Sequence, residues 1–292
     1  MSEEPFIAHR SLLFTVAYEM LGSVADAEDV VQETWLRWAA LGEDGQDEVR
    51  DPRAFLVRIV SRLALNRLRT VSRQREDYVG EWLPEPLLTS PDVAEDVELA
   101  ESVSIAMLAV LETLLPTERA VFVLREVFDV PYDEIAAALD KSPAAVRQVA
   151  TRARKHVAAR RPRMSVSRTE QQEVVERFLT ALTTGDLPGL LEVLAPDVLV
   201  VGDGGGLAPT APKSVRGASK LAPVMVTFAE LAPDAQTIVL DLNGAVAARL
   251  DPGGEYDTAM YFVVDAGRIT HIYGIRNPHK LEALGEVAQL RR

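Results

Sequence analysis

The sequence has 292 residues, 48% of them apolar, which allows two or three domains with their own cores and excludes a mostly disordered chain. It contains no cysteine, which excludes disulfides and a cysteine-based zinc site, and no apolar run approaches the ~18 residues that span a bilayer. The net charge of −13 argues at first sight against a nucleic-acid partner. We expect a cytoplasmic protein without metal, cofactor or membrane contact.

The charges are distributed unevenly along the chain. Residues 50–75 contain eight Arg and one Asp, and residues 141–163 contain eight Lys or Arg and no acidic residue. Between these blocks, residues 76–101 hold nine acidic residues and no basic one. This asymmetry indicates two surfaces that face nucleic acid, joined by an anionic segment. Two solvated helix faces would have the same composition.

The first predicted domain, residues 1–76, is helical. In SVADAEDVVQETWLRWAA the apolar residues recur at helical spacing, and Ser23 or Asp26 is suited to cap the start. The stretch LGEDGQDEVRDP breaks the pattern, so residues 41–51 are expected to form a loop, and RAFLVRIVSRLALNRLRTV resumes it. One surface carries carboxylates and an amide, and another is mainly basic. The residues are Asp26, Asp29, Gln32 and Glu33 on the first, and Arg58, Arg62, Asn66 and Arg69 on the second.

The segments DAEDVVQETWLRW and PRAFLVRIVSRLALNRLR, in this order, resemble region 2 of the sigma-70 superfamily in its extracytoplasmic-function (group 4) form. The resemblance implies that the first surface docks on the β′ clamp helices of core RNA polymerase. It also implies that the loop at residues 41–51 and the second surface read and open the −10 element. Cations suit the phosphates of a melted strand, and pockets suit its unstacked bases. Phe55 and Asn66 stand where Trp and Asp are common, so the finer −10 preference does not follow.

Residues 77–101 form a predicted acidic linker that includes the stretch GEWLPEPL at residues 80–87. Each proline restricts itself and the residue before it, so LPEP favours an extended conformation without helical hydrogen bonds. Trp82, Leu83 and Leu87 are apolar anchors that need a partner surface. A tryptophan packed on a neighbouring helix is the plainer interpretation.

Residues 102–163 form a second predicted helical domain. Pro116, Pro131 and Pro143 each mark the start of a helix, and Ser142 is suited to cap the third. A short helix, a tight turn and a basic helix constitute a helix-turn-helix, whose second helix enters the major groove. Arg and Gln side chains read bases, and the later basic residues hold phosphate. The candidates are Arg147, Gln148, Thr151, Arg152 and Lys155; a plain three-helix bundle is the alternative.

The string LPTERAVFVLREVFDVPYDEIA resembles sigma region 4, which recognises the −35 element and contacts the flap of the polymerase β subunit. With both regions in order, the chain is expected to be an alternative sigma factor whose partners are core RNA polymerase and promoter DNA. The competing interpretation is a ligand-sensing helix-turn-helix regulator. The acidic helix at residues 26–38 distinguishes the two, because a simple repressor has no use for it.

Residues 168–292 extend the chain well beyond region 4. Two helical patterns and a strand are followed by TIVLDL and AVAARL, which are joined by Asn243-Gly244, a strong hairpin signal. Two further strands meet at Ala266-Gly267. Helices followed by antiparallel strands indicate an α+β domain in which a sheet wraps helices.

Three short motifs resemble those of a sigma subgroup with a SnoaL-like (nuclear transport factor 2-like) extension. They stand here as Trp82, Leu83, Pro84, Glu85 and Pro86; Asp203, Gly204, Gly205 and Gly206; and Asn277 and Pro278, in a stretch ending at Leu281. Leu207 follows the glycines, where Lys is common. The predicted fold class is therefore multidomain: two all-α sigma domains followed by an α+β SnoaL-like domain. We expect the linker to lie against the other two motifs, so that the extension regulates the sigma domains in cis.

Free-standing proteins of the SnoaL-like fold that this extension resembles include cyclases, isomerases and epoxide hydrolases, which use an Asp or His pair in a pocket. Asp203, Asp241, His271 and Tyr273 are the candidates. Solitary histidines on strands are mostly structural, and a DGGG loop suits a backbone turn that another segment approaches closely. We therefore expect a non-enzymatic regulatory domain that contacts protein, with a small-molecule ligand or a catalytic site as alternatives.

Overall fold

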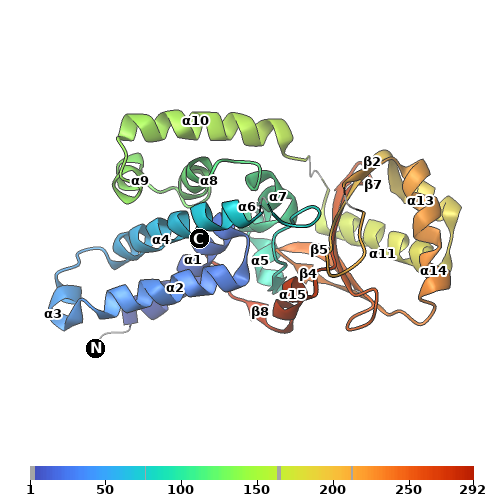
Figure 1. Ribbon diagram of the computed structural model, residues 1–292, viewed down its shortest axis with the longest axis horizontal. Coiled ribbons are helices and arrows are strands. Elements are labelled where there is room, and N and C mark those ends of the chain that lie inside the picture. The colour runs from blue at the N-terminus through green and yellow to red at the C-terminus, as the bar shows by residue number, and fades with distance from the viewer. Residues whose placement is uncertain (1–3, 76, 163–165, 212) are drawn as a thin grey trace.

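A computed structural model describes residues 4–75, 77–162, 166–211 and 213–292. The predicted domain boundaries at residues 76 and 163 lie outside this part. A helical half built from the first 160 residues lies beside a half built on one sheet, and the C-terminus returns to the helices (Figure 1).

The first helical unit contains four helices. They are α1 (Glu4–Leu21), α2 (Val24–Ala39), α3 (Gly42–Asp47) and α4 (Pro52–Arg75). Ser23 caps α2 by accepting a hydrogen bond from the Asp26 amide, as its position predicts.

Two of these helices, α1 and α3, were not predicted from the sequence. Helix α1 is buried nearly all round from Leu12 to Leu21, so it lacks a one-sided apolar pattern. Helix α3 lies in the stretch predicted to be a loop, because a local break in periodicity does not exclude a short helix.

The acidic linker has no helix or strand over residues 81–87, in line with the prolines, but it is structured further on. It forms the short strand β1 (Leu88–Thr89) and the helices α5 (Pro91–Glu95) and α6 (Val97–Val103). Asp96 caps α6 by accepting from the Leu99 amide at 3.0 Å. The composition of a solvated linker is therefore misleading here. Val93, Leu99 and Val103 are buried and tie these elements to the helical core.

The second helical unit contains the predicted helix-turn-helix. Its elements are α7 (Ile105–Leu111), α8 (Pro116–Phe122), a π-helical turn (Val123–Val127), α9 (Tyr132–Leu139) and α10 (Pro143–Arg160). The Ser142 hydroxyl caps α10 by accepting from the Ala145 amide. Asp140 ends α9 in the left-handed conformation, at φ 53°, and so forms the tight turn. Val146, Val149 and Ala150 are buried, as the periodicity of this helix predicts.

The C-terminal domain places helices on one face of a sheet. The helices are α11 (Arg168–Thr184), α12 (Leu187–Val193), α13 (Ala218–Val226) and α14 (Phe228–Leu231), followed late in the chain by α15 (Pro278–Leu281) and a 3-10 turn (Glu282–Gly285). The strands are β2 (Leu194–Asp203), β3 (Val215–Arg216), β4 (Thr237–Leu242), β5 (Ala245–Leu250), β6 (Thr258–Asp265), β7 (Arg268–Ile275) and β8 (Val287–Ala288). Both predicted hairpins are present, as the pairs β4–β5 and β6–β7. The predicted fold class is confirmed.

The sheet has the strand order β3-β2-β7-β6-β5-β4-β1-β8, so a strand of the linker lies between two strands of the C-terminal domain. Leu88 of β1 pairs with Leu242 of β4 on one side and with Val287 of β8 on the other. The linker is therefore part of the sheet. The C-terminal segment continues to the helices, where the amide of Arg291 donates to the Thr15 hydroxyl of α1 at 3.0 Å.

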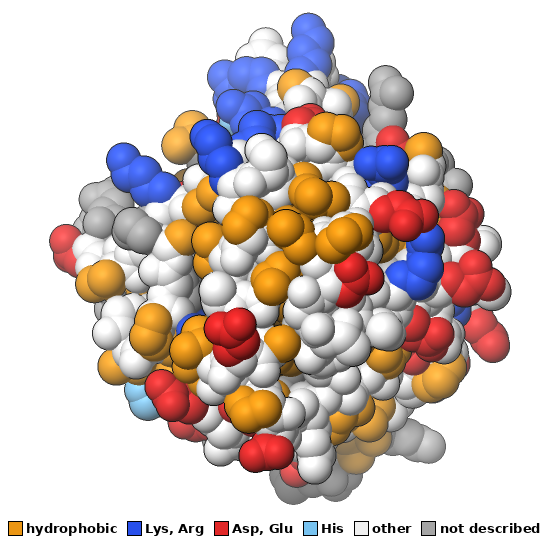
Figure 2. All heavy atoms as spheres, turned by 90° about the vertical axis from the view of Figure 1, so that its right-hand side faces the viewer, with side chains coloured by type: hydrophobic (Ala, Val, Ile, Leu, Met, Phe, Trp, Pro, Cys, Tyr) orange, Lys and Arg blue, Asp and Glu red, His pale blue; other side chains and the backbone are white. Residues whose placement is uncertain are grey.

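The two faces of the sheet belong to two different hydrophobic cores. On one face, Val246, Phe262 and Ile272 pack with α11, α12 and α13. On the other, Tyr261, Tyr273 and Ile275 join one continuous core with the helical units. The end of the molecule at α13 and α14 faces the viewer in Figure 2, which shows apolar side chains gathered at its centre. Val224 and Leu231 are among the exposed apolar residues of these two helices.

Candidate functional site

The surface of α2 expected to face polymerase is largely open to solvent. Asp29 and Gln32 are exposed, and Glu33 is half-exposed and pairs with Arg37 at 3.0 Å. Asp26 differs, because it is only 8% exposed and its carboxylate accepts two hydrogen bonds from Arg67 of α4, at 2.5 and 2.8 Å. Asp26 is therefore much less accessible than the other three residues of the predicted docking surface. Asp26 lies in the first turn of α2 and helps hold α2 on α4.

The residues expected to hold the melted −10 strand lie in one exposed stripe along α4. Arg58, Arg62, Asn66 and Arg69 are all exposed, while Leu56, Val60, Ala64 and Leu68 are buried on the opposite side. The guanidinium of Arg58 lies 5.3 Å from the centre of the Phe55 ring, which packs edge-on against Trp38. Cations beside a partly exposed aromatic ring are suited to single-stranded nucleic acid.

The residues expected to read the −35 element are all exposed on α10. They are Arg147, Gln148, Thr151, Arg152 and Lys155. The Thr151 hydroxyl donates to the carbonyl of Arg147, and Arg152 pairs with Glu118 at 3.5 Å. The first turns of this helix are the part that a helix-turn-helix presents to base edges. Both candidate DNA surfaces are thus open to solvent.

The two helical units nevertheless pack directly on each other. Helix α9 of the second unit and the preceding helix α8 both contact α4 of the first, and Figure 1 shows α9 and α8 between α4 and α10. A surface groove of about 390 Å³ marks this junction. It is lined by Arg50 just before α4, by Phe55 and Arg58 near the start of α4, and by Glu134 and Ala137 of α9. The second helical unit therefore lies beside the residues expected to capture −10 bases.

The carboxylate of Asp203 binds the linker to the C-terminal domain. Asp203, at the end of β2, has no solvent exposure. One carboxylate oxygen accepts from the amide of Leu83 at 2.8 Å and from Nζ of Lys280 at 2.7 Å; the other accepts from the hydroxyl of Tyr78 at 2.6 Å. Lys280 also donates to the carbonyl of Leu83 at 2.5 Å. The expected contact between the linker and the other two motifs is present.

Trp82 lies next to two cations from different parts of the chain. Arg75 of α4 has its guanidinium carbon 4.3 Å from the ring centre, and Nζ of Lys280 is 3.1 Å from it. Tyr78 packs edge-on against the same ring. Burial lowers the pKa of Lys280 to about 8, against the opposing effect of Asp203. A cation over an indole face is attracted by the ring quadrupole, so Trp82 connects α4 to the C-terminal domain.

The rest of the WLPEP motif contacts the first helical unit instead. The Glu85 carboxylate accepts from the Val24 amide at 2.6 Å, and its carbonyl accepts from the Tyr18 hydroxyl at 2.6 Å. Its amide donates to the carbonyl of Gly22 at 2.9 Å. Pro84 and Pro86 are buried. The motif therefore contacts both the first helical unit and the C-terminal domain, in line with the prediction that it ties the domains together.

The glycine loop allows the linker to approach the C-terminal domain closely. Gly205 and Gly206 have φ values of 60° and 73°, where a side chain is strained. A Cβ on Gly205 would collide with Asn277 and Tyr78, and one on Gly206 would press on Val79. Asn277 donates to the Tyr78 hydroxyl at 2.8 Å and caps α15, in which Pro278 takes the first position. The loop is a backbone turn, as expected; Gly204 precedes these two glycines.

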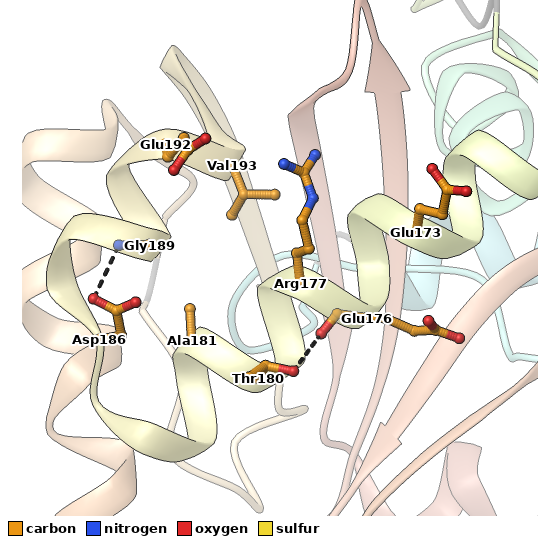
Figure 3. Close-up of a pocket in the computed structure, with 9 residues that line it drawn as sticks. All are labelled: Glu173, Glu176, Arg177, Thr180, Ala181, Asp186, Gly189, Glu192 and Val193. Carbon is orange, nitrogen blue, oxygen red and sulfur yellow. Dashed lines mark hydrogen bonds between the residues drawn. The ribbon is translucent and has the colours of Figure 1, made fainter.

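The four candidate acid–base residues do not form a catalytic group. The Asp203 carboxylate is taken up by the linker and Lys280, and Asp241 pairs with Arg168 at 2.5 Å. His271 contacts the Thr270 hydroxyl and lies 6.2 Å from the ring of Tyr273; burial lowers its pKa. A surface groove of about 810 Å³ does lie between α11 and α12 (Figure 3). Its lining includes Glu173, Arg177 and Asp186 but none of the four candidates.

Two residues of this site were not singled out from the sequence. Lys280 lies inside the quoted stretch ending at Leu281, and Tyr78 precedes the linker motif by four positions. A lysine next to a recognised asparagine-proline motif was a usable signal for Lys280. No local pattern indicated that Tyr78 would reach a carboxylate 125 positions away.

An acidic helix beside a basic one, a helix-turn-helix and an appended sheet together define a sigma-type transcription initiation factor. Residues 6–74 match the family model of sigma-70 region 2, and residues 104–157 match that of sigma-70 region 4. With the relatives described next, these matches show that the chain belongs to the extracytoplasmic-function sigma factors of RNA polymerase. Core RNA polymerase and promoter DNA are the partners of such a factor.

Relatives and a solved structure extend this similarity to the whole chain. The extracytoplasmic-function RNA polymerase sigma factor SigJ of Mycobacterium tuberculosis strain H37Rv is 40% identical, over 96% of this chain and 93% of its own length. The probable factor SigI of the same species is 32% identical, over 95% of this chain and 93% of its own length. The crystal structure of M. tuberculosis SigJ aligns with a TM-score of 0.76 at 37% identity, and covers 96% of this chain and 98% of that one.

In the described part of the chain, no helix is long and apolar enough to cross a membrane. Among the same residues, no group of three or more His, Asp or Glu side chains is placed to hold a metal ion.

Proposed function

We propose that this sigma factor is held in a closed arrangement by its own C-terminal domain and opens when it assembles with core polymerase in the cytoplasm. Asp29, Gln32 and Glu33 of α2 would contact the β′ clamp helices, and the second helical unit would contact the β flap. The stripe on α4 would hold the −10 strand, and the exposed residues of α10 would read the −35 element. The observation that carries the proposal is the Asp203 carboxylate, which binds the linker and is buried with Lys280.

The distances of promoter recognition support an opening step. Elements centred near −10 and −35 are about 25 base pairs apart, or on the order of 85 Å of duplex at ~3.4 Å per base pair. In the closed arrangement α9 contacts both α4 and α10, so the two DNA surfaces are separated by the thickness of about two helices, on the order of 20 Å. One straight promoter cannot occupy both surfaces until the units separate.

The closed arrangement restrains the protein without covering its surfaces. The exposed residues of α2, α4 and α10 remain open to solvent. Core polymerase can therefore dock on α2 while the units are still closed, and docking then favours separation. The linker has a second use in this scheme, since its acidic flanks suit the polymerase channel that the sigma linker occupies in this family. Contact with Asp203 and entry into that channel exclude each other.

A small-molecule ligand of the C-terminal domain receives no support from the residues suggested for it. Asp203 is buried beneath the linker, and Asp241 is paired with Arg168. A ligand at Asp203 would first have to displace Leu83 and Tyr78. The sigma domains are therefore regulated, in this proposal, by protein contacts within the chain.

The test is run-off transcription with purified core polymerase, using Asp203→Ala and Trp82→Ala. Asp203→Ala leaves Lys280 buried without its carboxylate in the closed arrangement. This raises the free energy of the closed arrangement by about 3–5 kcal/mol. Since 1.4 kcal/mol corresponds to a tenfold change in an equilibrium constant, we expect the fraction of open molecules to rise by at least ~10-fold. Promoter-dependent output should increase with it. Trp82→Ala loosens the same contact, but it also removes an anchor from the linker, so its gain is smaller.

Val97→Ala is the matched control, because Val97 belongs to the linker and is 73% exposed. It should leave output unchanged. If neither Asp203→Ala nor Trp82→Ala altered output or the mobility of the domains, as followed by amide exchange, regulation through this contact would be wrong.

A further inference from the structure

A second buried contact joins the C-terminal domain to the helices, and it differs in kind from the one at Asp203. Asn243 lies at the tip of the β4–β5 hairpin and has no solvent exposure. Its Nδ2 donates to the Tyr18 hydroxyl of α1 at 2.7 Å and to the carbonyl of Val103, at the end of α6, at 2.8 Å. Its Oδ1 accepts from the Leu87 amide of the linker at 2.8 Å and from the Tyr261 hydroxyl of β6 at 2.9 Å.

These four bonds use the complete hydrogen-bonding capacity of one amide. An asparagine side chain has two N–H donors and an oxygen that accepts two bonds. The orientation of the amide is determined by the backbone, because the Val103 carbonyl can only accept and the Leu87 amide can only donate. The partners belong to the first helical unit, the extended part of the linker, the sheet, and the end of α6, which directly precedes α7 of the second unit. Asp203, by contrast, makes no contact with the second unit in any described hydrogen bond.

We propose that Asn243 is the positioning residue that fixes the relative positions of the first helical unit, the linker and the second unit. The inference rests on the proposed function only in that both concern the closed arrangement. It assigns to the hairpin tip a role separate from that of Asp203. The backbone amide of Asn243 adds a fifth contact, donating to the Leu87 carbonyl at 2.9 Å.

The hairpin turn explains why asparagine suits this position. Asn243 has φ 51° and Gly244 φ 71°, the left-handed pair of a tight two-residue turn. Among side chains, asparagine and aspartate tolerate that conformation best. The tip is inserted deeply, because a Cβ on Gly244 would lie 2.8 Å from Cα of Ala100 and 3.4 Å from Val93. Aspartate would keep the shape and the turn but would lose both donors, and its carboxylate would face the Val103 carbonyl.

The network reaches beyond the amide. The Tyr18 hydroxyl accepts from Asn243 and donates to the Glu85 carbonyl, so the hairpin tip and the WLPEP motif are linked through α1. Burial raises the pKa of both Tyr18 and Tyr261, which keeps both hydroxyls protonated and able to donate. A buried network of this kind is costly when half-broken, since each lost partner leaves a polar group without water. Opening is therefore all-or-none.

The experiment measures the separation of the two helical units by energy transfer. Because the chain has no cysteine, Thr70→Cys on α4 and Ala159→Cys on α10 give two unique labelling positions, both exposed. Asn243→Asp and Asn243→Gly are compared in the full-length, doubly labelled protein. Both variants are expected to raise the fraction of molecules with open-state transfer at least tenfold. Amide-exchange protection of β6 and β7 should stay unchanged.

Ala266→Gly is the matched control, because Ala266 occupies the same position in the β6–β7 turn, at φ 48°, but is exposed. It should not change the transfer. Asp203→Ala is measured in parallel. If it opens the units and Asn243→Asp does not, the role of Asn243 is wrong and the proposed function stands. An opening by Asn243→Asp accompanied by lost protection of β6 and β7 also overturns the inference, since the domain would then have unfolded.

Discussion

The two faces of the C-terminal sheet show how one set of strands serves two purposes. Alternate residues of β6 point to opposite sides, so Phe262 packs with Phe178 of α11 while Tyr261 faces the helical units. The side that packs on α11, α12 and α13, here called the helix-facing side, is mainly apolar, and its buried Gln171 donates to the carbonyl of Phe262. The sigma-facing side includes Asp203, Asn243 and Lys280, all buried and bonded.

The two faces of the sheet differ in how many buried polar groups they contain, and this affects how specific each contact is. An apolar core loses stability wherever a buried side chain is removed. A buried polar interface adds little net stability, because desolvation offsets the attraction, but one set of partners satisfies it. Domain contacts within a chain are commonly of this more polar kind. The side that packs on α11, α12 and α13 therefore holds the domain together. On the side that packs on the helical units, the buried polar groups give a largely apolar contact its specific geometry.

The largest expected effect comes from the helix-facing core. Phe178→Ala removes a fully buried ring that packs 5.3 Å from Phe262, and we expect the free energy of unfolding of the C-terminal domain to fall by about 3–5 kcal/mol. Denaturant unfolding followed by amide exchange of β6 measures this. Leu191→Ala on α12 is the control, since Leu191 is 41% exposed. Equal losses for both variants would contradict the assignment of a closed apolar core.

A smaller effect is expected on the sheet face that packs on the helical units. It is the coupling energy between Asp203 and Lys280. Lys280→Met alone leaves the Asp203 carboxylate buried without its cation, whereas the pair Asp203→Asn and Lys280→Met leaves no buried charge. We expect the double variant to be more stable than the sum of the singles by about 0.5–3 kcal/mol. A double-mutant cycle in denaturant measures this. The exposed pair Arg216 and Asp197 is the control, and its coupling should stay below about 1 kcal/mol.

A third expected effect is a dependence on pH. Glu19 of α1 is fully buried between the helical units, and burial raises its pKa to about 8, against the effects of the Ser102 hydroxyl and Arg119. Between its ordinary pKa of 4.5 and about 8, the closed form binds a proton that the separated form releases. The closed form therefore weakens as pH rises through this window, by up to about 1.4 kcal/mol per unit.

Glu19→Gln tests that dependence, because glutamine keeps the size of the side chain and cannot ionise. Arg119 and its partner Glu112 face the same buried space and are left unchanged. Energy transfer between the labelled helical units should vary with pH in the unmodified chain between pH 6 and 7.5 and be flat in the variant. A pH slope that survived in Glu19→Gln would assign the effect to another group.

Much of the secondary structure followed from short-range signals. Ser142 and Pro143 marked the start of α10, and Asn243-Gly244 and Ala266-Gly267 marked both hairpins. These signals act over two to four residues, so no knowledge of the rest of the fold is needed. The exposed stripes on α4 and α10 followed from helical periodicity in the same way. Helix α1 did not, because burial on all sides removes the periodicity.

The sequence by itself determined the class of protein, the order of its domains, the caps and turns, and the surfaces expected to meet polymerase and DNA. Only the tertiary structure decided that Asp26 faces Arg67 rather than solvent, that Trp82 lies beside Lys280, and that one amide at Asn243 joins four segments. Those pairs are 18 to 225 positions apart along the chain. Such contacts depend on how whole domains pack, and no local pattern of residues encodes that geometry.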